Sequence, residues 1–351
     1  MKIKTNLIPS IHIIVVLVPW LTWLALVNMT TPWWLENIIS TPYIVVLVVI
    51  IAFLCINKSP SKIRFISYIT VNLLLATITN NYQIGNTNIY SLKRGKIALN
   101  CNINIAIFQF NMKYNDNIED NSQLINYLIK EEYDLITLQG VHQQEKKFII
   151  SRLKGSYPFY IIGENENKSS VTDQLIFSKY PLKDVTYHKI IDGHPFISSE
   201  WIIPNKNINT EANAILLYTL HPPSPRSKRL WEIRNSALNK LIESFIKDHK
   251  SGPLNRKAIV IGDLNIPKIS NRISSLEKLM HTKHINSWPN NDYLSIIFGL
   301  AIDHLWISKS AYICSRERID SFNGSDHYAI KSKIVLNNQS TIPISQGSAK
   351  K

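Results

Sequence analysis

The chain has 351 residues, a formal net charge of +14 and 45% hydrophobic residues. This length suits one large domain with an accessory segment. The sequence contains no CxxC pair, no Cys/His spacing typical of zinc sites, no internal repeat and no glycine-rich phosphate loop. It therefore argues against zinc-finger, repeat and P-loop classes of protein.

Three apolar runs without acidic residues occupy residues 11–27, 43–56 and 63–79. Each approaches the roughly 17 to 25 residues that a membrane-spanning helix needs. A cleaved signal peptide would explain the first run alone, and a soluble core helix is rarely apolar on every face three times in succession. We therefore expect residues 1–80 to form a three-span membrane anchor, followed by a juxtamembrane linker at residues 81–98.

Basic residues set the expected orientation of this anchor. They precede the first run and separate the second from the third: Lys2, Lys4, Lys58, Lys62 and Arg64. The connection between the first two runs carries only Glu36 as a charged residue. Because positively charged loops stay in the cytoplasm, the rest of the chain is predicted to be extracytoplasmic, attached to the inner or plasma membrane.

The chain after residue 97 carries 31 basic and 24 acidic residues. This mild basic excess favours an anionic surface or a phosphate-bearing partner, although a solvated basic face is an equally good explanation. Cys101 and Cys314 flank this part of the chain and are candidates for a disulfide in an oxidising compartment.

Strands and helices alternate after residue 98. Apolar patterning predicts strands at 102–110, 134–138, 173–178, 214–220, 257–262, 302–308 and 328–336, and helices at 119–132, 227–247 and 272–281. This alternation indicates a layered α/β domain over residues 99–338. The last residues, 339–351, are predicted to be disordered.

Polar residues follow or begin several of these strands, where a rigid sheet positions side chains. They are Asn111, His221, Asp263, Asn265, Asp303, His304, Asp326 and His327. Taken singly, Asp263 can be a turn former, His221 a surface histidine and His304 a packed, hydrogen-bonded histidine, which we keep as the role of His304. Their joint occurrence predicts a functional site.

The motifs "FQFN", "DLITLQ", "LIFSKYPL", "YTLHPPSP", "IVIGDLN", "IDHLWIS" and "GSDHYAI" resemble, in this order, those of the endonuclease/exonuclease/phosphatase superfamily. The resemblance spans residues 102–336 and implies two packed β-sheets flanked by helices, a four-layer α/β sandwich. "HPPSP" and the three preceding apolar runs are most similar to the membrane-anchored VanJ-like and YafD-like branch.

The resemblance also implies roles for the polar residues. Asn111 and Asp326 would hold Mg²⁺ or Mn²⁺, which prefer hard oxygen ligands. Asp263 and Asn265 would orient the attacking water and the phosphate, His327 held by Asp303 would contact the phosphate or act as a base, and His221 would stabilise charge on a phosphate oxygen. Arg226 and Arg229 are candidate phosphate ligands.

One position departs from this pattern. The family places a glutamate metal ligand directly after the strand "DLITLQ", whereas this chain has Gly140. Glycine has no side chain for coordination, so metal affinity should fall. Either Glu145 or a neighbouring residue replaces the ligand, or the protein is a degenerate enzyme that binds without turnover, or an altered enzyme works with a weakly held metal.

The apolar runs and the family resemblance together imply a membrane-anchored, metal-dependent phosphoesterase with a weakened metal site. It would act on phosphate esters or lipid-linked phosphates near the bilayer, because tethering concentrates such substrates. A binding protein for phosphorylated lipid or wall precursors is the first alternative. A nuclease is the second; nucleic acid is the less favoured partner because no basic groove interleaved with aromatic residues is evident.

Overall fold

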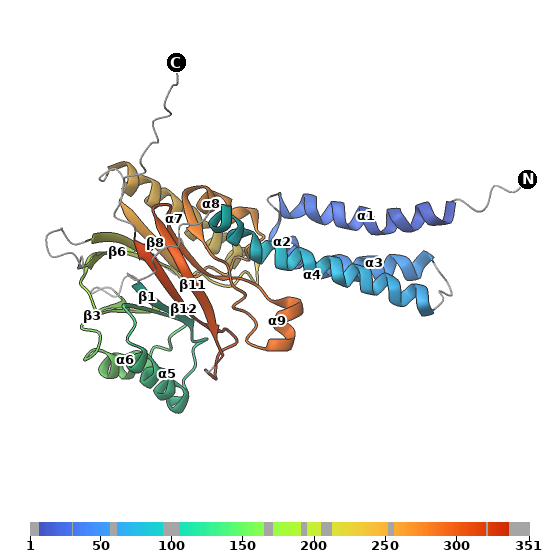
Figure 1. Ribbon diagram of the computed structural model, residues 1–351. Coiled ribbons are helices and arrows are strands. Elements are labelled where there is room, and N and C mark those ends of the chain that lie inside the picture. The colour runs from blue at the N-terminus through green and yellow to red at the C-terminus, as the bar shows by residue number, and fades with distance from the viewer. Residues whose placement is uncertain are drawn as a thin grey trace, which may run out of the picture.

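The computed structural model describes residues 7–29, 31–56, 62–93, 105–164, 171–190, 195–204, 213–251, 256–320 and 322–336. Within them, a group of amino-terminal helices projects from one side of an α/β domain (Figure 1).

Cys314 is disulfide-bonded and Cys55 is free. The other half of the predicted pair, Cys101, and the predicted disordered tail lie outside the described residues.

The amino-terminal helices carry the three apolar runs. They are α1 (Leu7–Val27), α2 (Trp33–Ile39), α3 (Tyr43–Ile56) and α4 (Lys62–Lys93). Buried Trp23, Val45 and Val49 pack α1 against α3. Helix α4 continues to Lys93, so most of the stretch interpreted as a linker is helical.

Three membrane spans are not confirmed. Among the described residues, one helical segment, Lys62–Thr79, is long and apolar enough to cross a bilayer. A second qualifies only if α2 and α3, which meet at a bend of 86°, count as one broken span, and the apolar part of α1, Ile13–Val27, is shorter than this criterion requires.

Two six-stranded sheets form the α/β domain in the described residues. The first has the order β11 (Ala311–Ile319), β12 (Ala329–Leu336), β1 (Ile105–Asn111), β2 (Leu135–Gln139), β4 (Val171–Ser178) and β3 (Phe159–Glu164). The second has the order β5 (Leu182–His188), β6 (Phe196–Ile203), β7 (Asn213–Thr219), β8 (Lys257–Asp263), β10 (Asp303–Ser308) and β9 (Met280–Thr282).

The sheets pack face to face, with helices on both outer faces (Figure 1). The central core joins residues such as Ile107 of the first sheet to Trp201 and Ile259 of the second. Helices α5 (Ile118–Glu131) and α6 (Glu145–Leu153) cover the first sheet, and α7 (Lys228–Ser251) and α8 (Ser274–Leu279) cover the second. The predicted sandwich of two sheets flanked by helices is confirmed.

Period-two alternation explains how β1 serves two cores at once. Ile105 and Ile107 point into the core between the sheets, whereas Phe108 and Phe110 face helix α5. The helix begins where the Asn117 side chain caps the backbone N–H groups of Glu119 and Asp120. It ends at Glu132, which takes a left-handed conformation.

Strand register brings the predicted site residues to one edge of the sandwich. Asn111 and Gln139 are paired at the carboxyl ends of the parallel strands β1 and β2. Asp263, the last residue of β8, pairs with Asp303, the first residue of β10. His221 follows β7, which is parallel to β8, and His327 precedes β12.

Candidate active site

The centre of the site is Asp263, whose side chain is fully buried. Its Oδ2 accepts a hydrogen bond of 2.8 Å from Asn111 Nδ2. The Nε2 atoms of His221 and His327 each lie 3.7 Å from this same oxygen. Four residues from β1, the segment after β7, β8 and the segment before β12 therefore converge on one point, although they are spread over more than 200 positions of the chain.

His327 is paired with Asp303, as the resemblance implies. Its Nδ1 lies 2.7 Å from Asp303 Oδ2, and both side chains are buried. Burial disfavours the imidazolium, but the carboxylates of Asp303, Asp263 and Asp326 outweigh it and raise the pKa of His327 to about 9. A pKa in this range favours the imidazolium at neutral pH, a form that can donate a proton or stabilise negative charge.

His221 forms a second pair of the same kind, with Asp173 of β4. Its Nδ1 lies 2.8 Å from Asp173 Oδ2, which also accepts a hydrogen bond from the hydroxyl of Tyr114. Burial opposes the charged form, yet Asp173 and Asp263 raise the pKa of His221 to about 9. A second imidazolium thus faces the common centre.

The pKa of Asp263 is raised as well, but in a carboxyl group a raised pKa favours the neutral form. Burial and the nearby Asp303 carboxylate raise the pKa of Asp263 to about 6, although both histidines and the Asn265 N–H favour its ionised form. A carboxylate with a pKa close to neutrality is suited to accept a proton from water. The resemblance gave Asp263 the task of orienting water, and this pKa adds the capacity to act as the base.

Asn265 holds the loop that carries Asp263. Its backbone N–H donates to Asp263 Oδ1 at 2.8 Å, and its side chain donates to the Pro222 carbonyl at 3.0 Å. Asn265 adopts a φ of 51°, which asparagine tolerates better than most residues. The structure thus shows Asn265 connecting the Asp263 loop to the segment after His221.

Asp326 lies at the more open end of the site. Its side chain is 38% exposed, and its Oδ2 is 3.1 Å from the ammonium of Lys113 and 3.1 Å from Trp288 Nε1. Burial alone would raise the pKa of Asp326, but these donors and His327 hold it below its ordinary value. The side chain of Lys113 is 55% exposed, so its charge is accessible from solvent.

Gly140 faces the turn that carries Lys113. Gly140 has a φ of 59°, and an added Cβ would lie 2.5 Å from Asn111 Oδ1 and 2.9 Å from the backbone nitrogen of Lys113. Lys113 and Tyr114 themselves have positive φ angles, and Tyr114 N–H donates to the Gly140 carbonyl. Glycine is needed because the turn at 112–115 fills the space into which a glutamate side chain would project.

The other predicted ligands are not brought to this centre. Glu145 begins α6 and accepts a hydrogen bond from Asn121 at 3.2 Å, with no contact to Asn111 or Asp326 among the described interactions. Arg226 and Arg229 are exposed at the start of α7. Arg234, further along α7, is fully buried and paired with Glu36.

The donor set fits a divalent metal ion poorly. Asp263, Asp303 and His327 offer atoms within 4.8 Å of one another, but Asp303 and His327 already share a hydrogen bond. At the other end, Asn111 Oδ1 accepts from Lys113 N–H at 2.9 Å, and the Asp326 carboxylate is paired with the Lys113 ammonium. Mg²⁺ is usually held by one or two carboxylates together with waters and substrate phosphates, and here a lysine engages the Asp326 carboxylate at this end of the site.

Several residues that shape the site escape motif-based prediction. Asp173, Tyr114, Lys113 and Trp288 contact site residues directly, and buried Arg316 donates to the Asp303 carbonyl at 2.8 Å. The sequence offered one sign that Asp173 belongs to the site, because this acidic residue begins the predicted strand "DQLIFS". His304, in contrast, has its predicted packed role: it is buried, its Nε2 lies 2.8 Å from the Ile266 carbonyl, and burial lowers its pKa to about 4.

Comparison with protein families matches residues 97–327 to the Endonuclease/Exonuclease/phosphatase family, and the chain belongs to this family. Its members include phosphatases and nucleases and typically depend on a divalent metal. No curated protein matches the sequence. Membership in the anchored VanJ-like branch is not shown by these comparisons.

Solved structures share the fold at low sequence identity. A family member from Bacteroides thetaiotaomicron has a TM-score of 0.51 and 16% identity, with 67% of this chain and 96% of that chain covered. A humanized TDP2 from D. rerio gives 0.51 and 14%, with 66% and 99% covered. A mannosyl-6-phosphatase from B. thetaiotaomicron gives 0.50 and 15%, with 66% and 99% covered. At these identities the likeness establishes the fold.

Proposed function

We propose that this protein is a membrane-anchored phosphoric ester hydrolase that acts on phosphate esters or lipid-linked phosphates close to the bilayer. The observation that carries the proposal is the convergence of His221 and His327, each paired with a carboxylate, on the buried Asp263: the Nε2 atom of each histidine lies 3.7 Å from Asp263 Oδ2. A protein that only folds around these residues would gain nothing from keeping two buried charged histidines, because burying charge is costly.

In the proposed reaction, Asp263 accepts a proton from the attacking water. The imidazolium groups of His327 and His221 stabilise the negative charge that develops on the phosphoryl oxygens, and His327 can give its Nε2 proton to the leaving oxygen. Asn111 and Asn265 hold Asp263 in place through their hydrogen bonds. Lys113, at the exposed end, is positioned to bind another phosphate oxygen.

Lys113 replaces part of the charge that a divalent ion supplies elsewhere in the family. An ammonium group beside Asp326 is a tethered cation that needs no metal ligands. Mg²⁺ or Mn²⁺, predicted from the resemblance, enters this proposal only as a weakly held ion at the Asp326 end. No step of the proposed reaction runs through it.

The membrane anchor is supported by the exposed surface of the helices. Many large apolar side chains on α1, α3 and α4 face outward, for example Leu17 at 51%, Leu47 at 53% and Ile66 at 61% exposed. Such a surface is stable in lipid and a liability in water. The described start of α1 lies far from the α/β domain, whereas α2 lies beside it (Figure 1), which agrees with an extracytoplasmic domain under the positive-inside rule.

A second apolar surface supports a lipid-linked substrate. Helix α9 (Asp292–Phe298) exposes Tyr293 at 84% and Ile296 at 64%. It lies against the domain-proximal end of the helical anchor (Figure 1), where the Tyr43 hydroxyl donates to the Ile296 carbonyl at 3.4 Å. The segment leading into α9 also contacts the site, because Asn290 N–H donates to the Asp326 carbonyl at 2.7 Å. The site and the expected bilayer surface are therefore neighbours.

The second candidate function is a phosphate-binding protein without turnover. Gly140 and the Lys113–Asp326 pair favour it, because both weaken a metal-dependent site while retaining cationic groups. The two candidates differ in one respect: a hydrolase releases product, whereas a binding protein retains its ligand unchanged.

The test is turnover by the full-length protein in lipid vesicles. Phosphomonoester and phosphodiester lipids, a soluble phosphate ester and single-stranded DNA serve as competing substrates. We expect hydrolysis of a lipid-linked phosphate, and we expect Tyr293→Ser with Ile296→Ser to slow this reaction but not hydrolysis of the soluble ester. Binding without product release would support the second candidate, and preferential cleavage of DNA would overturn the lipid assignment.

A further inference from the structure

A buried cluster of charges joins the amino-terminal helices to the α/β domain. Glu36 of α2 is the only acidic residue before Asp116, and it is 5% exposed. Its Oε1 accepts from Arg234 Nη2 at 2.7 Å, and its Oε2 accepts from Arg272 Nε at 2.8 Å. A single acid in a basic, apolar anchor is thus fully engaged by two arginines of the other domain.

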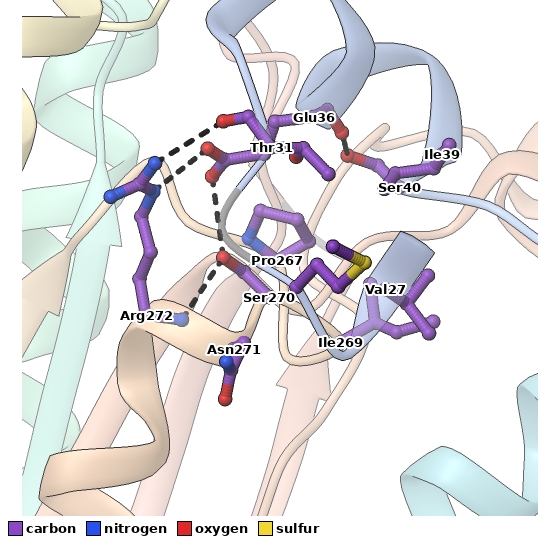
Figure 2. A pocket seen from close by; sticks show the side chains of 11 residues that line it. Val27, Thr31, Glu36, Ile39, Ser40, Pro267, Ile269, Ser270, Asn271 and Arg272 are labelled. Carbon is purple, nitrogen blue, oxygen red and sulfur yellow. Dashed lines mark hydrogen bonds and ion pairs between the residues drawn. The ribbon is translucent and has the colours of Figure 1, made fainter. Parts of the chain in front are cut away.

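Two further donors complete the contact. Ser270 Oγ donates to Oε1 at 3.2 Å, and Trp231 Nε1 donates to Oε2 at 2.7 Å. Figure 2 shows the Glu36 carboxylate facing Arg272 and Ser270 beside a small hollow, and the Ser40 hydroxyl donating to the Glu36 carbonyl. The Arg272 guanidinium also stacks on the Trp231 ring at 4.5 Å. Both carboxylate oxygens are satisfied, as a buried charge requires.

The same cluster reaches the active site through Arg234. While Nη2 binds Glu36, Nη1 donates to the backbone carbonyl of Asn265 at 2.8 Å. Asn265 N–H in turn donates to Asp263 Oδ1 at 2.8 Å. Glu36 is therefore three contacts from the carboxylate at the centre of the site, through buried Arg234 and the partly buried Asn265.

The position of these groups in the chain strengthens the connection. Ser270 and Arg272 lie in the segment directly after Asp263 and Asn265, and η1 (Asn271–Ile273) begins there. Trp231 and Arg234 lie on α7. This helix covers the second sheet, in which strand β8 ends at Asp263. The anchor thus contacts both the loop that carries Asp263 and the helix behind it.

We propose that α2 is a positioning element of the active site: Glu36 holds Arg234, and Arg234 holds the Asp263–Asn265 loop in its catalytic conformation. The anchor then does more than tether the domain, because undocking α2 leaves Arg234 buried without its partner and frees the loop. The activity part of this inference rests on the proposed function, whereas the docking part does not.

The experiment uses the full-length protein in vesicles and compares wild type with Glu36→Gln. Hydrogen exchange of peptides covering residues 263–273 reports the loop, and kcat and KM report the site. We expect faster exchange in the variant and a kcat lowered about 10-fold to 100-fold with KM little changed, since small misplacements of reacting groups carry losses of this order. The matched control is Glu232→Gln, an exposed acid on α7 that pairs with Lys228.

A milder variant guards against misfolding. Glu36→Asp keeps the negative charge on a shorter side chain, so it should show the same changes as Glu36→Gln at smaller amplitude and recover part of kcat. If loop exchange rises but no turnover is found even in the wild type, the docking stands and the proposed hydrolase activity fails. If turnover is present and Glu36→Gln changes neither exchange nor kcat, the inference is wrong.

Discussion

The two ends of the candidate site are built in different ways. At the histidine end, His327 is paired with the buried carboxylate of Asp303, His221 is paired with the mostly buried carboxylate of Asp173, and Asp263 lies between the histidines. At the Asp326 end, a half-exposed carboxylate is held by a flexible lysine beside a glycine that has no room for a side chain. The first end is preorganised and the second is adaptable.

For the proposed reaction, this difference indicates which groups stabilise the negative charge of the phosphate. Groups fixed before the substrate arrives stabilise a transition state most effectively, so the histidine end should carry the chemical step. The Asp326 end should contribute mainly to binding, with Lys113 as its cation. Variants at the two ends should therefore differ in the size of their effects and in the kinetic constant that changes.

The largest effect is expected at His327. His327→Ala removes both a cation and a proton donor, and general acid catalysis contributes about 10² to 10⁴-fold. We expect kcat to fall by about 10³-fold with KM little changed, measured under saturating substrate. His249→Ala on α7, whose ring packs on Phe245 outside the site, is the control. A loss confined to KM would show that His327 only binds substrate.

A smaller effect is expected at Lys113. A hydrogen bond to a charged group contributes about 1.5 to 3 kcal/mol, so Lys113→Ala should lower kcat/KM by about 10-fold to 100-fold. Most of this change should appear in KM, and Lys113→Arg should retain much of the wild-type value. Equal activity of Lys113→Ala and wild type would remove the distinction between the two ends.

The pH profile should follow the histidine end. Asp263 must be ionised to accept a proton, and its pKa of about 6 sets the acid limb. His327 and His221 must be protonated, and their pKa values of about 9 set the basic limb. We expect kcat/KM, which reports the groups of the free enzyme, to be flat between these values. It should fall about tenfold per pH unit below the pKa of Asp263, and up to about a hundredfold per unit above the pKa values of the histidines, because both must be protonated. Asp303→Asn, which removes the carboxylate paired with His327, should move the basic limb to lower pH; an unchanged limb would contradict this assignment.

The smallest effect concerns stability at Gly140. Gly140→Ala places a Cβ near Asn111 and Lys113 at a positive φ, which should lower the free energy of unfolding by about 1 to 3 kcal/mol. Gly155→Ala is the matched control, because nothing lies within 4 Å of a Cβ added there. Urea titration of both variants measures the difference.

Gly140→Glu should be destabilised for the same reason and should not gain activity. A stable, more active Gly140→Glu would mean that the turn at 112–115 readily makes room for the side chain.

Much of the fold was predictable because its central strands carry continuous apolar runs. Several central strands end within one or two residues of the predicted position, namely β1, β2, β7, β8, β10 and β12. The strands β3, β5, β6, β9 and β11 escaped prediction. All of these except β6 lie at the edges of the two sheets, where β5 is largely exposed and β9 has only three residues. The seven-residue helix α9 has no apolar stripe that separates it from a loop.

The candidate site was predictable only as far as motifs reach. His327 with Asp303, Asp263 with Asn265, and His221 were found because each lies at a strand end. Asp173 and Lys113 were not found, since their contacts depend on how β4 and the turn after β1 fold against partners far away in sequence. The role of Arg234 could not be predicted, because the sequence does not show that Glu36, 198 positions earlier, engages it.

The measurement that tests the central claim most directly is turnover of wild type and His327→Ala in the presence of a chelator and then of added Mg²⁺ or Mn²⁺. If phosphate is stabilised mainly by the histidines and Lys113, wild type keeps most of its activity with chelator and gains only a few-fold from either ion, while His327→Ala stays inactive throughout. If activity vanishes with chelator and returns fully with Mn²⁺, a bound metal supplies the charge and the role assigned to the histidines and Lys113 is wrong.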